Sequence, residues 1–219
     1  FVSSQGYRSF HSPDETNMIA QDDPRHAEQR ALVSRRFTPK AVRQHEAWLT
    51  ATITALIDEL PEGQFEVVDA LAAQLPCRLT AKLLGWPEDR WADIKSWSER
   101  LMRYDAVATD GEALMGMMNA IVEFNTDLQV MVGERKGCPV DQARDLIEVW
   151  ANAEIDGIGL DGETIMHETG LFISGGAETT RTVISRGLRT FCDHPDQWEA
   201  LAADPALLPG AVDELVRWV

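Results

Sequence analysis

The segment Gly175-Gly176-Ala177-Glu178-Thr179 places two glycines, an acid and a hydroxyl in a stretch whose periodicity predicts a helix. Each glycine inside a helix costs about 1 kcal/mol relative to alanine. A helix keeps adjacent glycines where something approaches its backbone closely or where it kinks. Thr179 lies one turn beyond Gly176 on the same face, with Glu178 beside it. A flat ligand over Gly176 would then have a route for protons. The alternative is a weak helix interior or a break into two helices.

A second candidate site is formed by His26 and Arg30, which are one helical turn apart on a face that Val33 and Phe37 continue. Two donors on a buried helical face suit an anionic ligand such as a carboxylate. The alternative is a surface histidine and arginine on an amphipathic helix. Residues 22–43 also carry more basic than acidic side chains, which would either steer an acidic partner or form a solvated face.

A third pattern, Glu214 and Arg217, places an acid and a base three residues apart near the end of the sequence. Such a pair within one helix is usually a minor contact of about a few tenths of a kcal/mol. Taken alone, it identifies no function.

Other patterns in the chain do not carry the chemistry that they resemble. The glycine-rich stretch 157–162 lacks the preceding strand and the following parallel strand that a dinucleotide site needs, so we interpret it as a loop between helices. His167-Glu168 lacks a second histidine four residues on, which argues against zinc. Three widely spaced cysteines, Cys77, Cys138 and Cys192, predict neither a disulfide framework nor a metal site.

The composition is that of a soluble globular protein, with 44% hydrophobic and 26% charged residues over 219 positions. Acidic residues outnumber basic ones by 36 to 20, which gives a formal charge of −16 and argues against nucleic-acid binding. Neither a signal peptide nor an apolar run of roughly 20 residues is visible. We therefore expect a cytoplasmic protein without a membrane span.

The elements that would position these residues are almost all helices. The sequence predicts a polar loop over 1–22, a helix that begins after Asp22-Asp23-Pro24 and ends near Pro39, and a second helix to about residue 60. A short β-type run at 65–68 follows. Further helices are predicted over about 70–84, 88–104, 112–135, 141–153 and 161–193, and after Pro195 and Pro209. Because no linker or repeat is visible, we expect one α-rich domain over 1–219.

Taken together and in this order, the three segments resemble the cytochrome P450 superfamily. Residues 26–39 look like its haem-flanking helix, and residues 175–179 are similar to the Ala/Gly-Gly-x-Asp/Glu-Thr motif of its long central helix. Glu214-Leu-Val-Arg217 matches its Glu-x-x-Arg. The resemblance implies a mainly α protein, the central-to-C-terminal helical portion of the cytochrome P450 fold, incomplete at both ends.

The resemblance also implies the roles of the site residues. His26 and Arg30 would hold a propionate of haem b (heme, iron protoporphyrin IX). Gly176 would line the oxygen pocket. Glu178 and Thr179 would be catalytic, delivering protons to dioxygen. The remaining pair, Glu214 and Arg217, would be structural.

The implied reaction inserts one oxygen atom from O₂ into a C–H bond of a hydrophobic substrate. Electrons would come from NAD(P)H through ferredoxin reductase and ferredoxin, and the basic segment 22–43 would receive the acidic ferredoxin. Residues 174–181 and 214–218 look most like those of actinobacterial enzymes that hydroxylate steroid or fatty side chains.

The axial ligand departs from the family pattern. Haem iron in this class needs a thiolate from a glycine-rich loop beyond the Glu-x-x-Arg helix, and none of the three cysteines stands in such a loop. The family's N-terminal sheet and first helices are also missing, so we expect this piece to be inactive alone. A non-catalytic, acidic helical ligand-binding or interaction module is the main alternative. A helical regulator without a small-molecule site would need the space over Gly176 to be filled.

Overall fold

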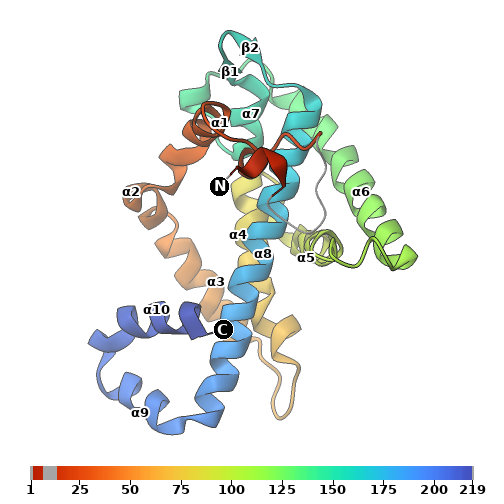
Figure 1. The fold of residues 1–219 in the computed structure, drawn as a ribbon. Helices are drawn as coiled ribbons and strands as arrows, with labels where there is room; N and C mark the ends of the chain where they lie inside the picture. The colour runs from red at the N-terminus through yellow and green to blue at the C-terminus, as the bar shows by residue number, and fades with distance from the viewer. Residues whose placement is uncertain (1, 7–13, 219) are drawn as a thin grey trace.

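The computed structural model describes residues 2–6 and 14–218, and its regular structure in this part of the chain is almost entirely helical (Figure 1). This confirms the expected mainly α class. The α-helices are α1 (Arg25–Ser34), α2 (Pro39–Arg43), α3 (Glu46–Asp58), α4 (Gln74–Leu84), α5 (Trp91–Leu101), α6 (Gly111–Arg135), α7 (Leu146–Asn152), α8 (Gly162–Asp193), α9 (Pro195–Ala203) and α10 (Leu208–Trp218). The short helices are η1 (Ser3–Gln5), η2 (Met18–Ala20), η3 (Arg35–Phe37), η4 (Val68–Ala72), η5 (Glu88–Arg90), η6 (Val140–Gln142) and η7 (Pro205–Leu207).

Aspartate side chains fix where three of the principal helices begin. The carboxylates of Asp110, Asp145 and Asp161 accept backbone N–H groups in the first turns of α6, α7 and α8. These groups would otherwise lack a hydrogen-bond partner, since the first turn of a helix has no preceding carbonyls. At the other end of α4, Gly85 takes the left-handed conformation that terminates a helix, with φ of 95°.

The long helix α8 is the centre of the structure, and α4, α5, α6 and α7 all pack against it (Figure 1). Aromatic side chains from these helices meet in the core. Trp97 of α5 contacts the rings of Trp86 and Phe124, and Trp150 of α7 contacts Phe172 of α8. The core therefore packs around the first half of α8, and the glycine motif 175–179 lies at the middle of this helix.

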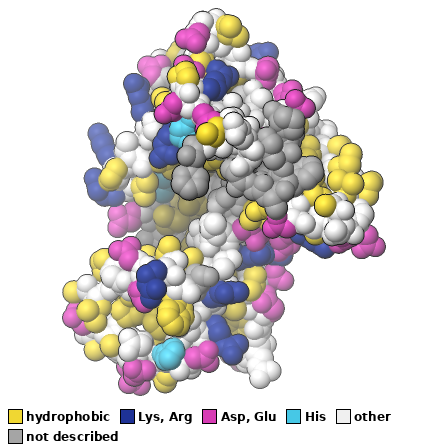
Figure 2. Space-filling view, in the orientation of Figure 1, with side chains coloured by type: hydrophobic (Ala, Val, Ile, Leu, Met, Phe, Trp, Pro, Cys, Tyr) yellow, Lys and Arg dark blue, Asp and Glu magenta, His cyan; other side chains and the backbone are white. Residues whose placement is uncertain are grey.

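The second half of α8 is covered more sparsely. It continues into α9 and α10, which fold back beside it at one end of the molecule (Figure 1). No residue of α9, and none of α10 up to Trp218, is buried. Figure 2 shows apolar side chains gathered over this end. The exposed apolar residues include Leu207, Leu208, Val212, Val216 and Trp218.

The β-type run predicted at 65–68 is wrong. Phe65 is exposed and Val68 begins the π-helical turn η4. The reason is local, because the carboxylate of Glu66 accepts the backbone N–H groups of Val68 and Asp69 at 3.0 and 2.6 Å. This arrangement caps a helical turn, and no neighbouring strand is present among the described residues to pair with an extended segment.

Two further boundaries differ from the sequence-based expectation. The helix predicted from Pro39 to about residue 60 is divided into α2 and α3. Asp22 does not cap α1 through its side chain, because its carboxylate accepts the backbone N–H groups of Ser3 and Ser4 instead.

The loop expected at 157–162 contains a hairpin. Strands β1 (Glu154–Ile155) and β2 (Ile158–Gly159) pair antiparallel, with Ile155 opposite Ile158. Asp156 and Gly157 form the turn with φ of 54° and 75°, values that favour an Asp-Gly pair. The hairpin leads from α7 into α8, so the stretch connects two helices, as the sequence predicted.

Candidate functional site

The glycine motif lies inside α8, which runs through it without a break. The two glycines serve different surroundings. A Cβ on Gly176 would stand 2.5 Å from the Thr80 hydroxyl oxygen of α4, whereas a Cβ on Gly175 would meet nothing within 4 Å. Close packing of α4 on α8 therefore explains Gly176, and Gly175 is the glycine with open space.

The sequence predicted that Gly176 leaves room for a flat ligand, but the structure gives the open space to Gly175. The side on which its side chain would stand is closed by Thr80, although part of the Gly176 backbone is exposed. The position one turn before Thr179 that remains open is Gly175. The Thr179 hydroxyl donates to the Gly175 carbonyl at 3.0 Å, and both residues are exposed.

Glu178 faces a different neighbour from Thr179. Its carboxylate pairs with Arg181 and accepts the Ser98 hydroxyl of α5 at 3.4 Å. Arg181 also binds Glu99 at 2.6 Å, which in turn binds Lys95 at 2.9 Å. Burial raises the pKa of Glu178, and the Arg181 charge opposes this rise. The acid is therefore part of an ion-pair network between α8 and α5 in this arrangement.

His26 and Arg30 lie on α1 (Figure 1). His26 Nδ1 lies 3.0 Å from the Met18 carbonyl, which only accepts, so Nδ1 carries the proton of this bond. Arg30 is exposed and forms no ion pair with another described residue. On the same face, the ring of Phe37 lies 5.9 Å from that of Phe172. This contact ties the end of the α1 region to α8.

The sequence did not reveal an apolar pocket of about 500 Å³ beside the first half of α8. Four segments form it, namely the stretch before α1, the end of α5, the middle of α6 and α8. Most lining side chains are apolar, and the α8 wall ends at Ser174 and Gly175. The lining residues are Glu15, Asn17, Ile19, Leu101, Met102, Tyr104, Met117, Ile121, Phe124, Met166, His167, Gly170, Leu171, Ser174 and Gly175.

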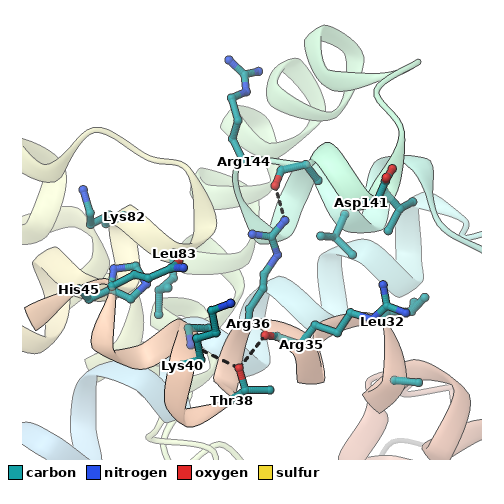
Figure 3. A pocket seen from close by; sticks show the side chains of 16 residues that line it. Leu32, Arg35, Arg36, Thr38, Lys40, His45, Lys82, Leu83, Asp141 and Arg144 are labelled. Carbon is teal, nitrogen blue, oxygen red and sulfur yellow. Dashed lines mark hydrogen bonds between the residues drawn. The ribbon is translucent and has the colours of Figure 1, made fainter.

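A larger pocket, of about 820 Å³, lies between α1, α2, α4 and α7 and is strongly basic (Figure 3). Its central side chain, Arg36, donates to the Ala143 carbonyl. Arg35 and Lys40 also line this pocket (Figure 3). The cations in its lining are Arg35, Arg36, Lys40, Lys82 and Arg144, against the acid Asp141. Two of them are neutralised from outside the lining, because Lys82 pairs with Glu88 at 3.0 Å and Arg144 pairs with Glu148 at 2.9 Å. On a chain of net charge −16 the excess of cations in the lining is a local reversal of sign.

The remaining predicted residues, Glu214 and Arg217, pair with each other on the surface of α10. Their side chains lie 2.6 Å apart and are 58% and 65% exposed. The hydrogen bond to Arg217 lowers the pKa of Glu214, and the same bond raises the pKa of Arg217, so each residue favours the charged form of the other. Within the described part of the chain, neither side chain forms a hydrogen bond or an ion pair with a motif residue of α8.

None of the cysteines is arranged as a metal ligand. Cys77 is buried in the core of α4, and burial raises its pKa to about 12. Cys138 is partly buried and Cys192 is exposed at the end of α8. Within residues 2–6 and 14–218, no three metal-ligating side chains lie close enough to hold an ion. Over the same residues, no helix is long and apolar enough to cross a membrane.

Comparison with known proteins identifies the class. No family model matches the chain. A steroid C26-monooxygenase of Mycobacterium tuberculosis (strain CDC 1551 / Oshkosh) is 36% identical over 203 residues, covering 92% of this chain and 54% of the relative. A methyl-branched lipid omega-hydroxylase of Mycobacterium bovis is 32% identical over 209 residues, covering 92% of this chain and 47% of the relative. The solved cytochrome P450 of Mycobacterium marinum in complex with pseudoionone matches with a TM-score of 0.88 and 30% identity, over 100% of this chain and 54% of that one.

In sequence and in fold, the chain belongs to the cytochrome P450 superfamily. It spans about half the length of the curated relatives it matches. The helical portion seen here is the part of that fold that the sequence motifs predicted.

Proposed function

We propose that this chain supplies the distal wall and one edge of the haem site in a monooxygenase that inserts one oxygen atom from O₂ into a C–H bond. The observation that supports this most directly is the open turn at Gly175 and Thr179, placed at the end of an apolar pocket on the same helix. An exposed hydroxyl and an open helix backbone next to an apolar cavity suit oxygen chemistry on a hydrophobic molecule.

The residues His26 and Arg30 and the open turn at Gly175 and Thr179 fit a haem, whereas Cys77 does not fit as its axial ligand. We propose that His26 and Arg30 hold its propionates, because Arg30 is exposed and without an ion pair among the described residues. His26 uses Nδ1–H for Met18, so only the doubly protonated ring can also donate from Nε2. Cys77 does not fit as the axial thiolate, since it is packed in the core. When bound, haem would supply the oxygen activation itself.

Within this proposal, Thr179 and Glu178 have different parts in proton transfer, because they lie on different faces of α8. The Thr179 hydroxyl donates to Gly175, and its lone pairs are left to accept from water at the open face. Glu178 is separated from this face by its bonds to α5. Because burial raises the pKa of Glu178, its protonated form is easier to reach than that of an exposed glutamate. Release from Arg181 would let it pass that proton towards Thr179.

The substrate is proposed to be a hydrophobic molecule of the steroid or fatty side-chain class. The apolar pocket has a volume of about 500 Å³, within the range of small-molecule sites. The relatives named as a steroid C26-monooxygenase and a methyl-branched lipid omega-hydroxylase support the same class.

Electrons from NAD(P)H are proposed to arrive through a ferredoxin reductase and an acidic ferredoxin that docks at the basic pocket of Figure 3. Two of its cations, Arg35 and Arg36, follow directly on the helix that carries His26 and Arg30, so the docking surface lies close to the proposed haem edge. Exchange of Arg35 and Lys40 for glutamine should weaken ferredoxin binding and reduce its dependence on salt.

The main test uses the product of the full coding sequence. We expect its reduced, carbon-monoxide-bound form to show the Soret band of thiolate-ligated haem. Thr179→Ala should keep this band but form less product for each NAD(P)H consumed. Thr180→Ala, a change at the exposed neighbouring threonine, is the matched control and should behave as the unchanged protein.

A non-catalytic helical binding module is the alternative. It is favoured by the packing of Gly176 on Thr80 and by the ion pairs of Glu178, because both residues then have structural explanations. Folded protein that lacks the thiolate band would support this module and exclude the monooxygenase.

A further inference from the structure

The apolar pocket beside α8 has a polar corner at the end remote from Gly175. Glu15, Asn17 and His167 meet there. The amide of Asn17 donates to the Glu15 carboxylate at 2.6 Å, and the Asn17 oxygen accepts the Ala20 backbone N–H at 3.1 Å. Each polar atom of the Asn17 side chain therefore already has one partner within the protein, and Nδ2 keeps a second N–H.

The His167 ring forms hydrogen bonds with other residues through Nδ1 alone among the described residues. The backbone N–H of Thr16 donates to His167 Nδ1 at 3.1 Å, and the Thr16 hydroxyl lies 2.9 Å from the same atom. A backbone amide only donates, so Nδ1 is the acceptor and the neutral ring carries its proton on Nε2. No described residue accepts from Nε2. The tautomer is thus fixed with a spare N–H donor on a residue that lines the pocket.

The spacing along α8 relates this donor to the open turn. His167 precedes Gly175 by eight residues and Thr179 by twelve on one continuous helix. At a rise of 1.5 Å per residue, the two positions lie about 12 and 18 Å further along the helix axis. Between them the wall consists of Gly170, Leu171 and Ser174, and the facing side chains of α6 are apolar.

We propose that His167 is a specificity-determining residue that donates from Nε2 to an oxygen at one end of an elongated, otherwise apolar substrate. The hydrogen bond would place the opposite end of the molecule, about 12 to 18 Å away, at the turn of Gly175 and Thr179. A sterol with a ring oxygen and an aliphatic side chain has this shape, as does a methyl-branched fatty alcohol. The inference rests on the proposed function for the identity of the reacting end, but not for the binding contact itself.

The test compares ligands that differ only in the terminal oxygen. Equilibrium dialysis, which needs no haem signal, gives the Kd of a 3-keto sterol and of its 3-deoxy analogue for the product of the full coding sequence. A methyl-branched fatty alcohol and its alkane form the second pair and distinguish a lipid from a steroid. We expect the oxygenated member of the fitting pair to bind about three- to tenfold more tightly, as one net hydrogen bond allows.

His167→Phe should abolish this preference by weakening only the oxygenated ligand. His167→Gln keeps an acceptor for Thr16 and an N–H donor, so it should restore most of the preference. Met166→Leu changes the neighbouring apolar wall and should affect both ligands alike. A preference that survives in His167→Phe, or none in the unchanged protein for either pair, would overturn the inference. The carbon-monoxide spectrum of the same sample tests the proposed function separately.

Discussion

Glu168 offers a sharp test of how α8 is buried. The residue is 1% exposed, and Oε1 accepts the Met18 backbone N–H at 2.9 Å. The other oxygen, Oε2, has no hydrogen-bond partner among the described residues. Burial raises the pKa of Glu168 to about 7, against the opposing effects of the Met18 N–H and the Arg25 charge. We expect Glu168→Gln, which cannot ionise, to be the more stable protein at high pH.

The direction follows from the two pKa values. The exposed carboxyl of the unfolded chain has its ordinary pKa of 4.5, so the folded state holds the proton more tightly. The free energy of unfolding therefore falls as the pH rises from about 4.5 through about 7, and the stabilising effect of the protonated form is complete only below the lower value. Each pH unit between them corresponds to about 1.4 kcal/mol, so the total loss is on the order of 3 kcal/mol.

The assay is urea unfolding of both proteins, followed by circular dichroism between about pH 5 and pH 8. The difference between the two free energies of unfolding cancels every other titrating group. It should move by roughly 2 to 3 kcal/mol in favour of Glu168→Gln as the pH rises. Glu163→Gln, at an exposed position in the first turn of the same helix, is the control and should show a difference that hardly varies with pH. A constant difference for Glu168→Gln as well would refute the argument.

Further predictions concern the glycine pair and the cysteines. Gly176→Ala should lower the melting temperature, because crowding against Thr80 costs about 1 to 3 kcal/mol and exceeds the gain in helix propensity of about 1 kcal/mol. Gly175→Ala meets no neighbour and should raise it, and an opposite order would contradict the assignment of the two faces. Iodoacetamide should label Cys192 in the folded protein while Cys77, whose pKa is raised to about 12, stays unlabelled by peptide mass spectrometry. Equal labelling would show that α4 is not packed as described.

The central helix was predictable because its signals are local. Asp161 is a strong N-cap residue, the apolar periodicity continues from there to residue 193, and the glycine motif could be placed on it by counting. The hairpin also has a local signal, since Asp156-Gly157 between two isoleucines favours a tight turn, although the glycine-rich stretch by itself predicts only a loop. The β prediction at 65–68 fails because the capping carboxylate of Glu66 outweighs the β propensity of the apolar residues.

The apolar pocket could not be predicted from the sequence in the same way. Its walls include Ile19, Met102, Ile121 and Leu171, which come from four distant segments. Which apolar side chains of amphipathic helices meet each other and which border a cavity is decided by tertiary packing, and periodicity identifies only the buried face. The fixed tautomer of His167 depends likewise on a contact with Thr16, 151 residues away.

The geometry of α8 also explains why adjacency in a motif misleads. Successive residues on a helix are rotated by about 100°, so neighbours in sequence point to different surroundings. Here Gly176 meets α4, Glu178 meets α5, and Gly175 and Thr179 share the open face. An acid and a hydroxyl that stand side by side in the sequence are therefore not a ready-made proton relay. Proton transfer between them requires either that Glu178 leaves Arg181 or that a water molecule bridges the two faces. The contacts of Glu178 with Arg181 and with Ser98 of α5 would therefore control the rate of proton delivery in the proposed reaction.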